Sequence, residues 1–216
     1  MEIFDIVEHM HDKQIKIDHD RLYQIAETQS GHFTAKQALE VGMSRSTLSY
    51  HSRPGGRYWR RGPGVYRFRQ YPSGQYEHVL EAWLEMHTPD AVVSHVTALE
   101  MYDICDVISD KIHITLPRSQ RWRTAPNYVK LHFVKDPPLS REEQSELESM
   151  PVTGIERTLL DYVDAGGYPD QFEMGILQAL THGMTTRSML NEAADGRSRH
   201  VRMWLRIVLS RAKVGA

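Results

Sequence analysis

The sequence has almost no cysteine and no long apolar run. Cys105 is the single cysteine among 216 residues, so an intrachain disulfide is excluded, which fits a reducing cytoplasm. No run approaches the ~20 apolar residues that a bilayer-spanning helix needs. The first ten residues carry Glu2, Asp5 and Glu8 instead of the positive start of a secretory signal. We therefore expect a cytoplasmic protein that does not enter a membrane.

Acidic residues are absent from one stretch of the chain. Residues 44–76 contain seven arginines and no Asp or Glu. Residues 17–72 as a whole hold nine Lys/Arg against four Asp/Glu, whereas residues 73–216 hold 15 against 20, within a net charge of −2. An acid-free arginine cluster is typical of a site for a polyanion. The alternative is a solvated basic surface with no partner.

A second acid-free stretch lies near the C-terminus. Residues 197–213 contain six Lys/Arg and no Asp or Glu. Cations near the end of a helix complement its dipole, which is a sufficient reason for them. A second contact with an anionic partner is the other interpretation, and the sequence favours neither.

Signatures of catalysis are also lacking. The twelve histidines show no HExxH pattern and no metal-ligand pairing with cysteine. No GxSxG elbow or phosphate-binding loop occurs. We interpret His95 as a hydrogen-bonded histidine near the core, and Arg157 with Asp161 as a surface ion pair at i, i+4 spacing. We expect no enzymatic activity, no cofactor and no metal.

Capping signals predict three helices within residues 17–72. The first follows the candidate N-caps Asp18 and Asp20 and ends at Gly31. Thr34-Ala-Lys-Gln37 has the form of a capping box that begins the second helix, and Ser44 is an N-cap for the third. A short Gly-containing turn separates the second and third helices, as in a helix-turn-helix.

A β-hairpin is expected directly after the third helix. Residues 58–61 and 65–69 favour strands, joined by the turn Arg61-Gly-Pro-Gly64. Alternation along the second strand places Tyr66 and Phe68 on one face and Arg67 and Arg69 on the other. A basic hairpin in this position is the wing of a winged helix-turn-helix.

The third helix and the wing predict the residues that contact DNA. With Leu48 as the buried anchor, a rotation of 100° per residue places polar side chains on the opposite face, toward a major groove. Arg45 and Arg53 are expected to matter most, because arginine binds guanine bidentately. The wing arginines are expected to contact phosphates or the minor groove. The predicted contacts are Arg45, Ser46, Ser49, Tyr50, Arg53, Arg57, Arg60, Arg61 and Arg67.

Three regions follow from these patterns: an N-terminal extension over residues 1–16 with a short helix over 2–10, the winged helix over 17–72, and a larger domain over 77–216. Period-two alternation predicts strands at Lys111–Leu116 and Tyr128–Val134, in a sheet with one covered face, and Pro151–Thr153 adds a short strand. The expected helices span residues 77–87, 94–102, 155–164, 169–182, 186–194 and 199–212. The fold class is α+β, with several helices at the C-terminal end.

Six segments of the chain carry a resemblance to a known family: Leu22–Gly31, Thr34–Gly42, Arg60–Tyr66, Ser94–Leu99, Ile112–Pro117 and Val152–Asp161. In this order they resemble the AbiEi-type antitoxins of bacterial type IV toxin–antitoxin systems. The resemblance covers most of residues 20–165, and the segments of the second domain are the more specific ones. The chain departs from the family pattern in its 16-residue extension and in lacking the nuclease-like domain that some similar proteins append.

The resemblance implies a function for each domain. In the family, the winged helix binds inverted repeats upstream of its own operon and represses it, and the C-terminal domain counters a nucleotidyltransferase toxin. It also implies a monomer or weak dimer whose two copies pair on the operator DNA. Two alternatives stay open: a winged-helix regulator unrelated to toxins, with a ligand-sensing or assembly domain, and a nucleic-acid-modifying enzyme whose active-site residues converge only in the fold.

Overall fold

The chain is divided into two units, residues 1–72 and 73–216. The computed structural model describes residues 16–135, 139–140 and 143–212. The helix expected over residues 2–10 lies outside the described residues. Among the residues that are described, no helix has both the length and the apolar composition needed to cross a bilayer.

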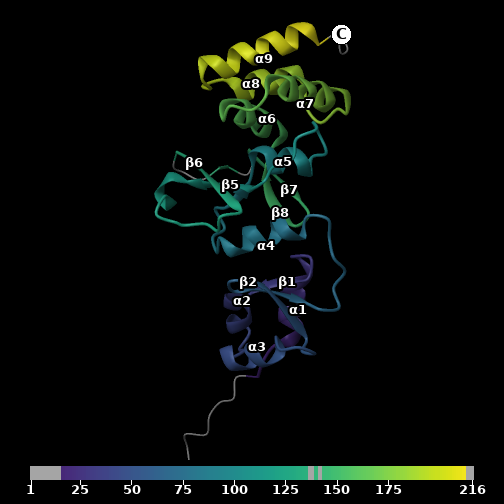
Figure 1. The fold of residues 1–216 in the computed structure, drawn as a ribbon, viewed down its shortest axis with the longest axis vertical. Coiled ribbons are helices and arrows are strands. Elements are labelled where there is room, and N and C mark those ends of the chain that lie inside the picture. The colour runs from purple at the N-terminus through teal and green to yellow at the C-terminus, as the bar shows by residue number, and fades with distance from the viewer. Residues whose placement is uncertain (1–15, 136–138, 141–142, 213–216) are drawn as a thin grey trace, which may run out of the picture. The chain divides into compact units, whose positions relative to one another are not determined.

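The N-terminal unit is a winged helix-turn-helix (Figure 1). Three helices pack with an antiparallel sheet in the order β1-β3-β2, and the hairpin β2–β3 forms the wing. The elements in chain order are α1 (His19–Glu27), β1 (His32–Thr34), α2 (Ala35–Glu40), α3 (Arg45–His51), β2 (Tyr58–Gly62) and β3 (Val65–Phe68).

Side-chain caps begin all three helices at the expected residues. The Asp18 carboxylate accepts from the Arg21 amide at 2.9 Å, and the Ser44 hydroxyl accepts from the Thr47 amide at 3.0 Å. Thr34 and Gln37 form the full capping box, with each side chain accepting from the backbone amide of the other residue. These bonds satisfy amides that have no partner inside the helix, so the helix starts are fixed locally.

The strand β1 has no counterpart in the sequence prediction. Its central residue, Phe33, is fully buried and contacts the rings of Tyr58, Tyr66 and Phe68. β1 pairs with β3, so the segment between the first two helices closes the sheet beneath this aromatic core. A three-residue strand shows no periodic pattern, and only its pairing identifies it.

The second unit combines a mixed sheet with a set of C-terminal helices (Figure 1). The five strands lie in the order β6-β5-β4-β8-β7, with β5–β6 and β4–β8 parallel and the other pairs antiparallel. Around the sheet the elements are α4 (Glu77–Glu85), β4 (Val92–Val93), α5 (His95–Met101), β5 (Ile112–Pro117), the 3-10 turn η1 (Arg118–Gln120), β6 (Val129–Val134), β7 (Gln144–Leu147) and β8 (Met150–Thr153). The helices that follow are α6 (Ile155–Asp164), α7 (Pro169–Thr181), α8 (Arg187–Ala194) and α9 (Arg199–Arg211).

Helix α6 lies at the centre of the helical part. Leu159 and Leu160 are fully buried, and Phe172 of α7, Leu190 of α8 and Val201 of α9 pack in the same cluster. These helices match the ranges expected from the sequence within two residues. The whole molecule is therefore the predicted α+β fold, with the helices gathered after the sheet.

Both faces of β5 are covered, which corrects the expectation of a sheet with one covered face. Ile114 and Leu116 pack with Ala82 and Met86 of the α4 segment. The alternate residues His113 and Thr115 face α5 and are also buried, at 7% and 1% exposure. The sequence alternates between apolar and polar residues because the second covered face of β5 buries polar side chains. Polar residues in such an alternation usually indicate an exposed face, so the sequence pattern predicted only one covered face.

Candidate functional site

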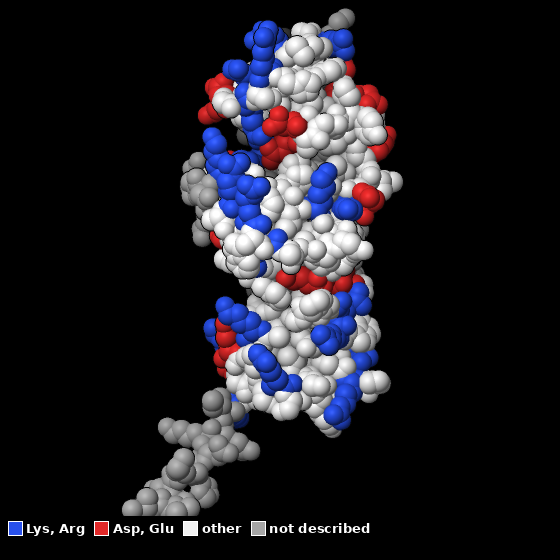
Figure 2. All heavy atoms as spheres, turned by 60° about the vertical axis from the view of Figure 1, so that its left-hand side comes forward, with Lys and Arg blue, Asp and Glu red and all other residues white. Residues whose placement is uncertain are grey.

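All but one of the predicted DNA-contact residues lie on the surface of the N-terminal unit. Arg45, Ser46, Ser49, Tyr50, Arg53, Arg57, Arg60 and Arg61 are exposed, whereas Leu48 is buried, as the helical rotation about that anchor requires. Figure 2 shows basic side chains spread over the visible face of this unit with few acidic ones among them. A polyanion can approach such a surface without meeting like charge.

The exposed end of α3 presents an aromatic and a cationic group together. The Tyr50 side chain is 62% exposed, and the Arg53 guanidinium lies 5.5 Å from the centre of its ring. Arg45 is the first residue of the same helix, so the two arginines lie near opposite ends of α3. Arg45 and Arg53 can therefore contact separate positions along a groove.

Arg67 is buried, and its predicted role as a phosphate contact is wrong. Its side chain is 1% exposed, donates to the Tyr71 carbonyl at 2.5 Å, and lies 5.3 Å from the Trp59 ring centre. Arg69 lies at the same distance from Trp59 and donates to the Arg53 carbonyl. Arg67 and Arg69 on the second face of the wing thus pack on Trp59 and donate hydrogen bonds to backbone carbonyls. The alternation of residues along β3 shows that they share a face, but it does not show whether that face is exposed.

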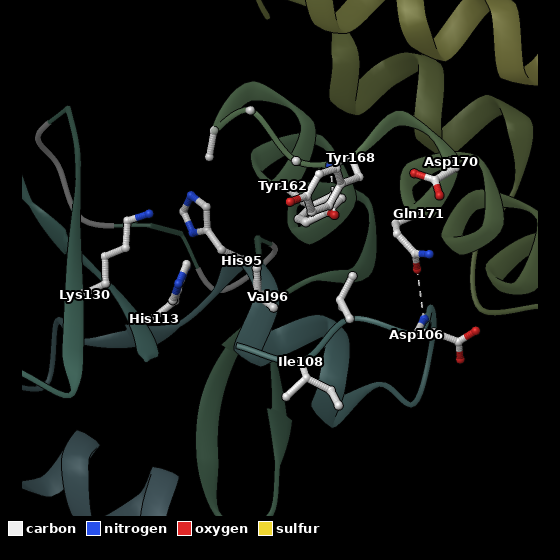
Figure 3. A pocket seen from close by; sticks show the side chains of 14 residues that line it. His95, Val96, Asp106, Ile108, His113, Lys130, Tyr162, Tyr168, Asp170 and Gln171 are labelled. Atoms are coloured by element: carbon white, nitrogen blue, oxygen red, sulfur yellow. Dashed lines mark hydrogen bonds between the residues drawn. The ribbon is translucent and has the colours of Figure 1, made fainter. Parts of the chain in front are cut away.

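A pocket of about 580 Å³ opens on the second unit between the sheet and the helical part. Figure 3 shows His95, His113 and Lys130 at one end of it, and Asp106, Tyr168 and Gln171 at the other. Gly166 and Gly167, which follow α6, also line it. The pocket brings together residues from five separate stretches of the chain, so no local sequence motif indicates it.

Three histidines gather beside this pocket. His95 begins α5, His113 lies on β5 and His132 on β6. The His132 Nε2 and His113 Nδ1 atoms are 3.1 Å apart, and the His95 and His132 rings stack with centres 3.5 Å apart. His95 is 7% exposed and its Nδ1 bonds the Ser94 hydroxyl at 2.9 Å, in agreement with the interpretation of a hydrogen-bonded histidine near the core.

These histidines are neutral at neutral pH. Burial lowers the pKa of His95 to about 2 and the pKa values of His113 and His132 to about 4. Burial is the largest cause for each pKa, followed by a neighbouring histidine for His95 and His113 and by Lys130 for His132. A neutral imidazole keeps one nitrogen lone pair available as an acceptor or ligand.

The histidine cluster was missed because its members lie on three elements with no motif spacing. Known metal-ligand motifs place their ligands on one helix or pair them with cysteine, and these residues satisfy neither condition. One signal was available: His113 occupies a polar position of the alternating strand, between Ile112 and Ile114. A polar residue on the inner face of a buried strand needs a partner, and here the partners are histidines from neighbouring elements.

The Arg157–Asp161 pair is part of a partly buried network, which corrects its interpretation as a surface ion pair. The Asp161 side chain is 8% exposed and accepts from Arg157 at 3.2 Å and also from Arg197. Arg157 also donates to Glu143. Arg197 therefore belongs to this network and not to a free basic face at the C-terminus.

The remaining arginines of α9 divide into two sets. Arg199, Arg202 and Arg206 are exposed, and Figure 2 shows basic side chains gathered on the helical part of the second unit. Arg211 lies 3.4 Å from Glu173 on α7. Val201, Leu205 and Val208 face the core, so the helix packs by one side and presents the first three arginines on the other.

Comparison with known proteins supports the fold. No protein-family model matches the sequence, and no curated protein matches it. Among solved structures, the chain is similar to the crystal structure of the RV2827C protein from Mycobacterium tuberculosis, with a TM-score of 0.56 and 15% sequence identity. The match covers 90% of this chain and 76% of that chain. At this identity the likeness shows a shared α+β fold across both units.

Proposed function

We propose that the protein is a sequence-specific DNA-binding repressor that uses α3 and the wing to bind its operator. One observation supports this most strongly: eight predicted contact residues, five of them arginines, are exposed on a winged helix-turn-helix whose residues 44–76 contain no acid. Arg45 and Arg53 read base edges from α3, and Arg57, Arg60 and Arg61 bind phosphates. Arg67 is excluded from this set by its burial.

The second part of the proposal is that the larger domain is the antitoxin of a type IV toxin–antitoxin system. Its support is the resemblance of six ordered segments to AbiEi-type antitoxins. The partners are operator DNA with inverted repeats and a nucleotidyltransferase toxin, and two copies of the chain pair on the repeat. In this proposal the protein represses and neutralises without catalysing a reaction.

The pocket of the second unit favours one other function. A transcriptional regulator unrelated to toxins would bind a small ligand there, because ligand sites are concave and combine apolar walls with a few polar groups. His95, His113 and Lys130 supply the polar groups, and Val96 and Ile108 supply apolar ones. Under this alternative the DNA-binding unit has the same role, and the larger domain senses the ligand.

DNA binding to the region upstream of the gene, measured over a salt series, tests the repressor proposal. Arg45→Ala should cost roughly 1–3 kcal/mol and relax sequence preference, because it removes a base contact. Arg60→Ala should weaken all sequences alike and flatten the salt slope by about one. Arg21→Ala, an exposed arginine on α1, is the matched control and should bind like the wild type. Failure of the wild type to bind this DNA at moderate salt would contradict the proposal.

The antitoxin part is tested separately by co-expression with a nucleotidyltransferase encoded beside the gene. The wild type should restore growth, and the double variant Arg45→Ala, Arg60→Ala should restore it equally when expressed from an unrelated promoter. Loss of rescue in a variant that truncates residues 77–216 would agree with the proposal. Growth inhibition that the full chain cannot relieve would leave the ligand-sensing regulator as the better explanation.

A further inference from the structure

The histidine cluster has the geometry of a candidate metal site. The ligand nitrogens of His95, His113 and His132 all lie within 4.8 Å of one another. Adjacent nitrogens around a zinc ion at ~2.1 Å stand somewhat closer than this, so small side-chain movements bring all three to one ion. Each of the three residues belongs to a helix or strand of the second unit.

The sheet and α5 hold the cluster in place. In the parallel pair β5–β6, His113 is opposite Lys130 and Thr115 is opposite His132, so the four side chains share one face. The first turn of α5 is fixed against this face: the Ser94 amide donates to the His113 carbonyl at 3.0 Å, and the His113 amide donates to the Thr97 hydroxyl at 2.9 Å. Two backbone-anchored contacts thus hold His95 over the two strand histidines.

The surroundings of His95 are those of an oriented ligand. Its backbone φ of +54° lies in a region that residues other than glycine rarely adopt, so the fold holds it there against strain. The Ser94 hydroxyl bonds its Nδ1 and accepts from the Thr115 hydroxyl at 2.7 Å. When Nδ1 carries the ring proton and donates it to the Ser94 hydroxyl, Nε2 keeps its lone pair for a metal ion, as in metal-bound histidines whose other nitrogen donates to a partner.

We propose that His95, His113 and His132 bind one transition-metal ion, of which Zn²⁺ is the best match. Three imidazoles suit zinc, copper or nickel, whereas magnesium and calcium prefer oxygen ligands. Three protein ligands leave a fourth position for water or a ligand. Because His95 and His113 line the pocket, that fourth position is accessible from it (Figure 3).

Binding requires one movement that can be observed. The His95 and His132 rings are nearly parallel, with an angle of 16° between their planes, and parallel rings cannot both point a nitrogen at one ion. One ring must turn about its Cβ–Cγ bond as the ion enters. The ion therefore replaces the His95–His132 stack with shared coordination, and the ring resonances of these residues should shift together.

Titration of the full chain with zinc after treatment with a chelator tests the proposal. Calorimetry should show one equivalent bound, and Co²⁺ in place of zinc should give the intense visible absorption of a four-coordinate nitrogen site. His132→Gln should weaken binding at least about 100-fold, and Ser94→Ala, which removes the hydrogen-bond partner of the His95 Nδ1 atom, by about 10- to 100-fold. His182→Gln, an exposed histidine on the same unit, is the matched control and should bind like the wild type.

Two results would overturn the proposal: a wild type that binds no stoichiometric zinc, and a His132→Gln variant that binds it unchanged. Should His132→Gln fail to fold, as judged by circular dichroism, the histidine NMR spectrum of the wild type decides. Shifts at three histidines on addition of one equivalent of zinc support the site. Shifts confined to other histidines refute it.

Discussion

Asp161 on α6 accepts hydrogen bonds from Arg197, which precedes α9, and from Arg157, one turn earlier on its own helix. The carboxylate is 8% exposed, and both guanidinium groups are less than one-fifth exposed. Arg157 also binds Glu143 at the start of the β7 segment. A single carboxylate therefore joins α6 to the start of α9 and, through Arg157, to the edge of the sheet.

Asp161→Asn should lower the free energy of unfolding by about 3 kcal/mol, because it removes the anion that pairs with the partly buried Arg197 and leaves Arg157 with Glu143 alone. Urea unfolding followed by circular dichroism and tryptophan fluorescence measures this. Glu173→Gln is the control, since its pair with Arg211 is more exposed and should be worth at most about 1 kcal/mol. Equal losses for the two variants would show that the Asp161 network is no stronger than a surface pair.

Two glycines with nearly the same backbone φ should respond differently to substitution by alanine. Gly31 has φ +83° and Gly55 has φ +81°. A Cβ on Gly31 would lie 2.3 Å from the Tyr71 ring, whereas a Cβ on Gly55 would meet no atom within 4 Å. Gly55→Ala should cost about 1 kcal/mol from backbone strain alone. Gly31→Ala should cost clearly more, about 3 kcal/mol, since Tyr71 must also move.

The comparison of Gly31→Ala with Gly55→Ala is made by thermal unfolding of the two variants and the wild type. Tyr71→Gly provides a test of the cause, because removing both the ring and its Cβ, which lies 2.4 Å from the added Cβ, should bring the cost of Gly31→Ala down to that of Gly55→Ala. A Gly31→Ala cost that persists in the Tyr71→Gly background would assign the effect to the backbone and not to the contact.

Arg67→Ala should destabilise the N-terminal unit, and Arg60→Ala should not. Arg67 is buried against Trp59 and bonded to the Tyr71 carbonyl, so its loss removes packing as well as a hydrogen bond, at about 1–3 kcal/mol. Arg60 is exposed, and its replacement should change stability by less than about 0.5 kcal/mol. Hydrogen exchange of the amides in residues 58–68 measures the effect locally, and unchanged exchange in Arg67→Ala would contradict this role.

Cys105 should react slowly with alkylating reagents in the folded protein. Burial, with a smaller effect from the neighbouring Asp106, raises the pKa of its thiol from 9.0 to about 11. Only the thiolate reacts, so a pKa raised by two units leaves about 100-fold less reactive form at pH 8. Labelling by iodoacetamide should therefore be about 100-fold slower than in urea and should rise with pH up to about 11. A native rate that reaches a plateau near pH 9 would show an ordinary thiol.

The sequence alone determined the helices of both units and the two main strands of the second unit. Thr34 with Gln37 and Ser44 cap their helices through bonds that span three residues, so the information lies within one turn of chain. The alternation of residues 111–116 likewise defines β5 as a strand without reference to its neighbours. Even so, α4 ends at Glu85 and not at residue 87, where the sequence predicted its end, and His87 adopts a φ of +50°.

The tertiary structure decided which segments pair and which side chains are buried. Strands β1, β4 and β7 have two to four residues each, too few for a pattern, and only their partners define them. Arg67 was expected on an open face because alternation separates two faces but cannot say whether each is covered. His95, His113 and His132 meet because α5 lies over β5 and β6. Capping and periodicity act within a few residues, whereas burial and side-chain clusters depend on segments that come together only in the folded chain.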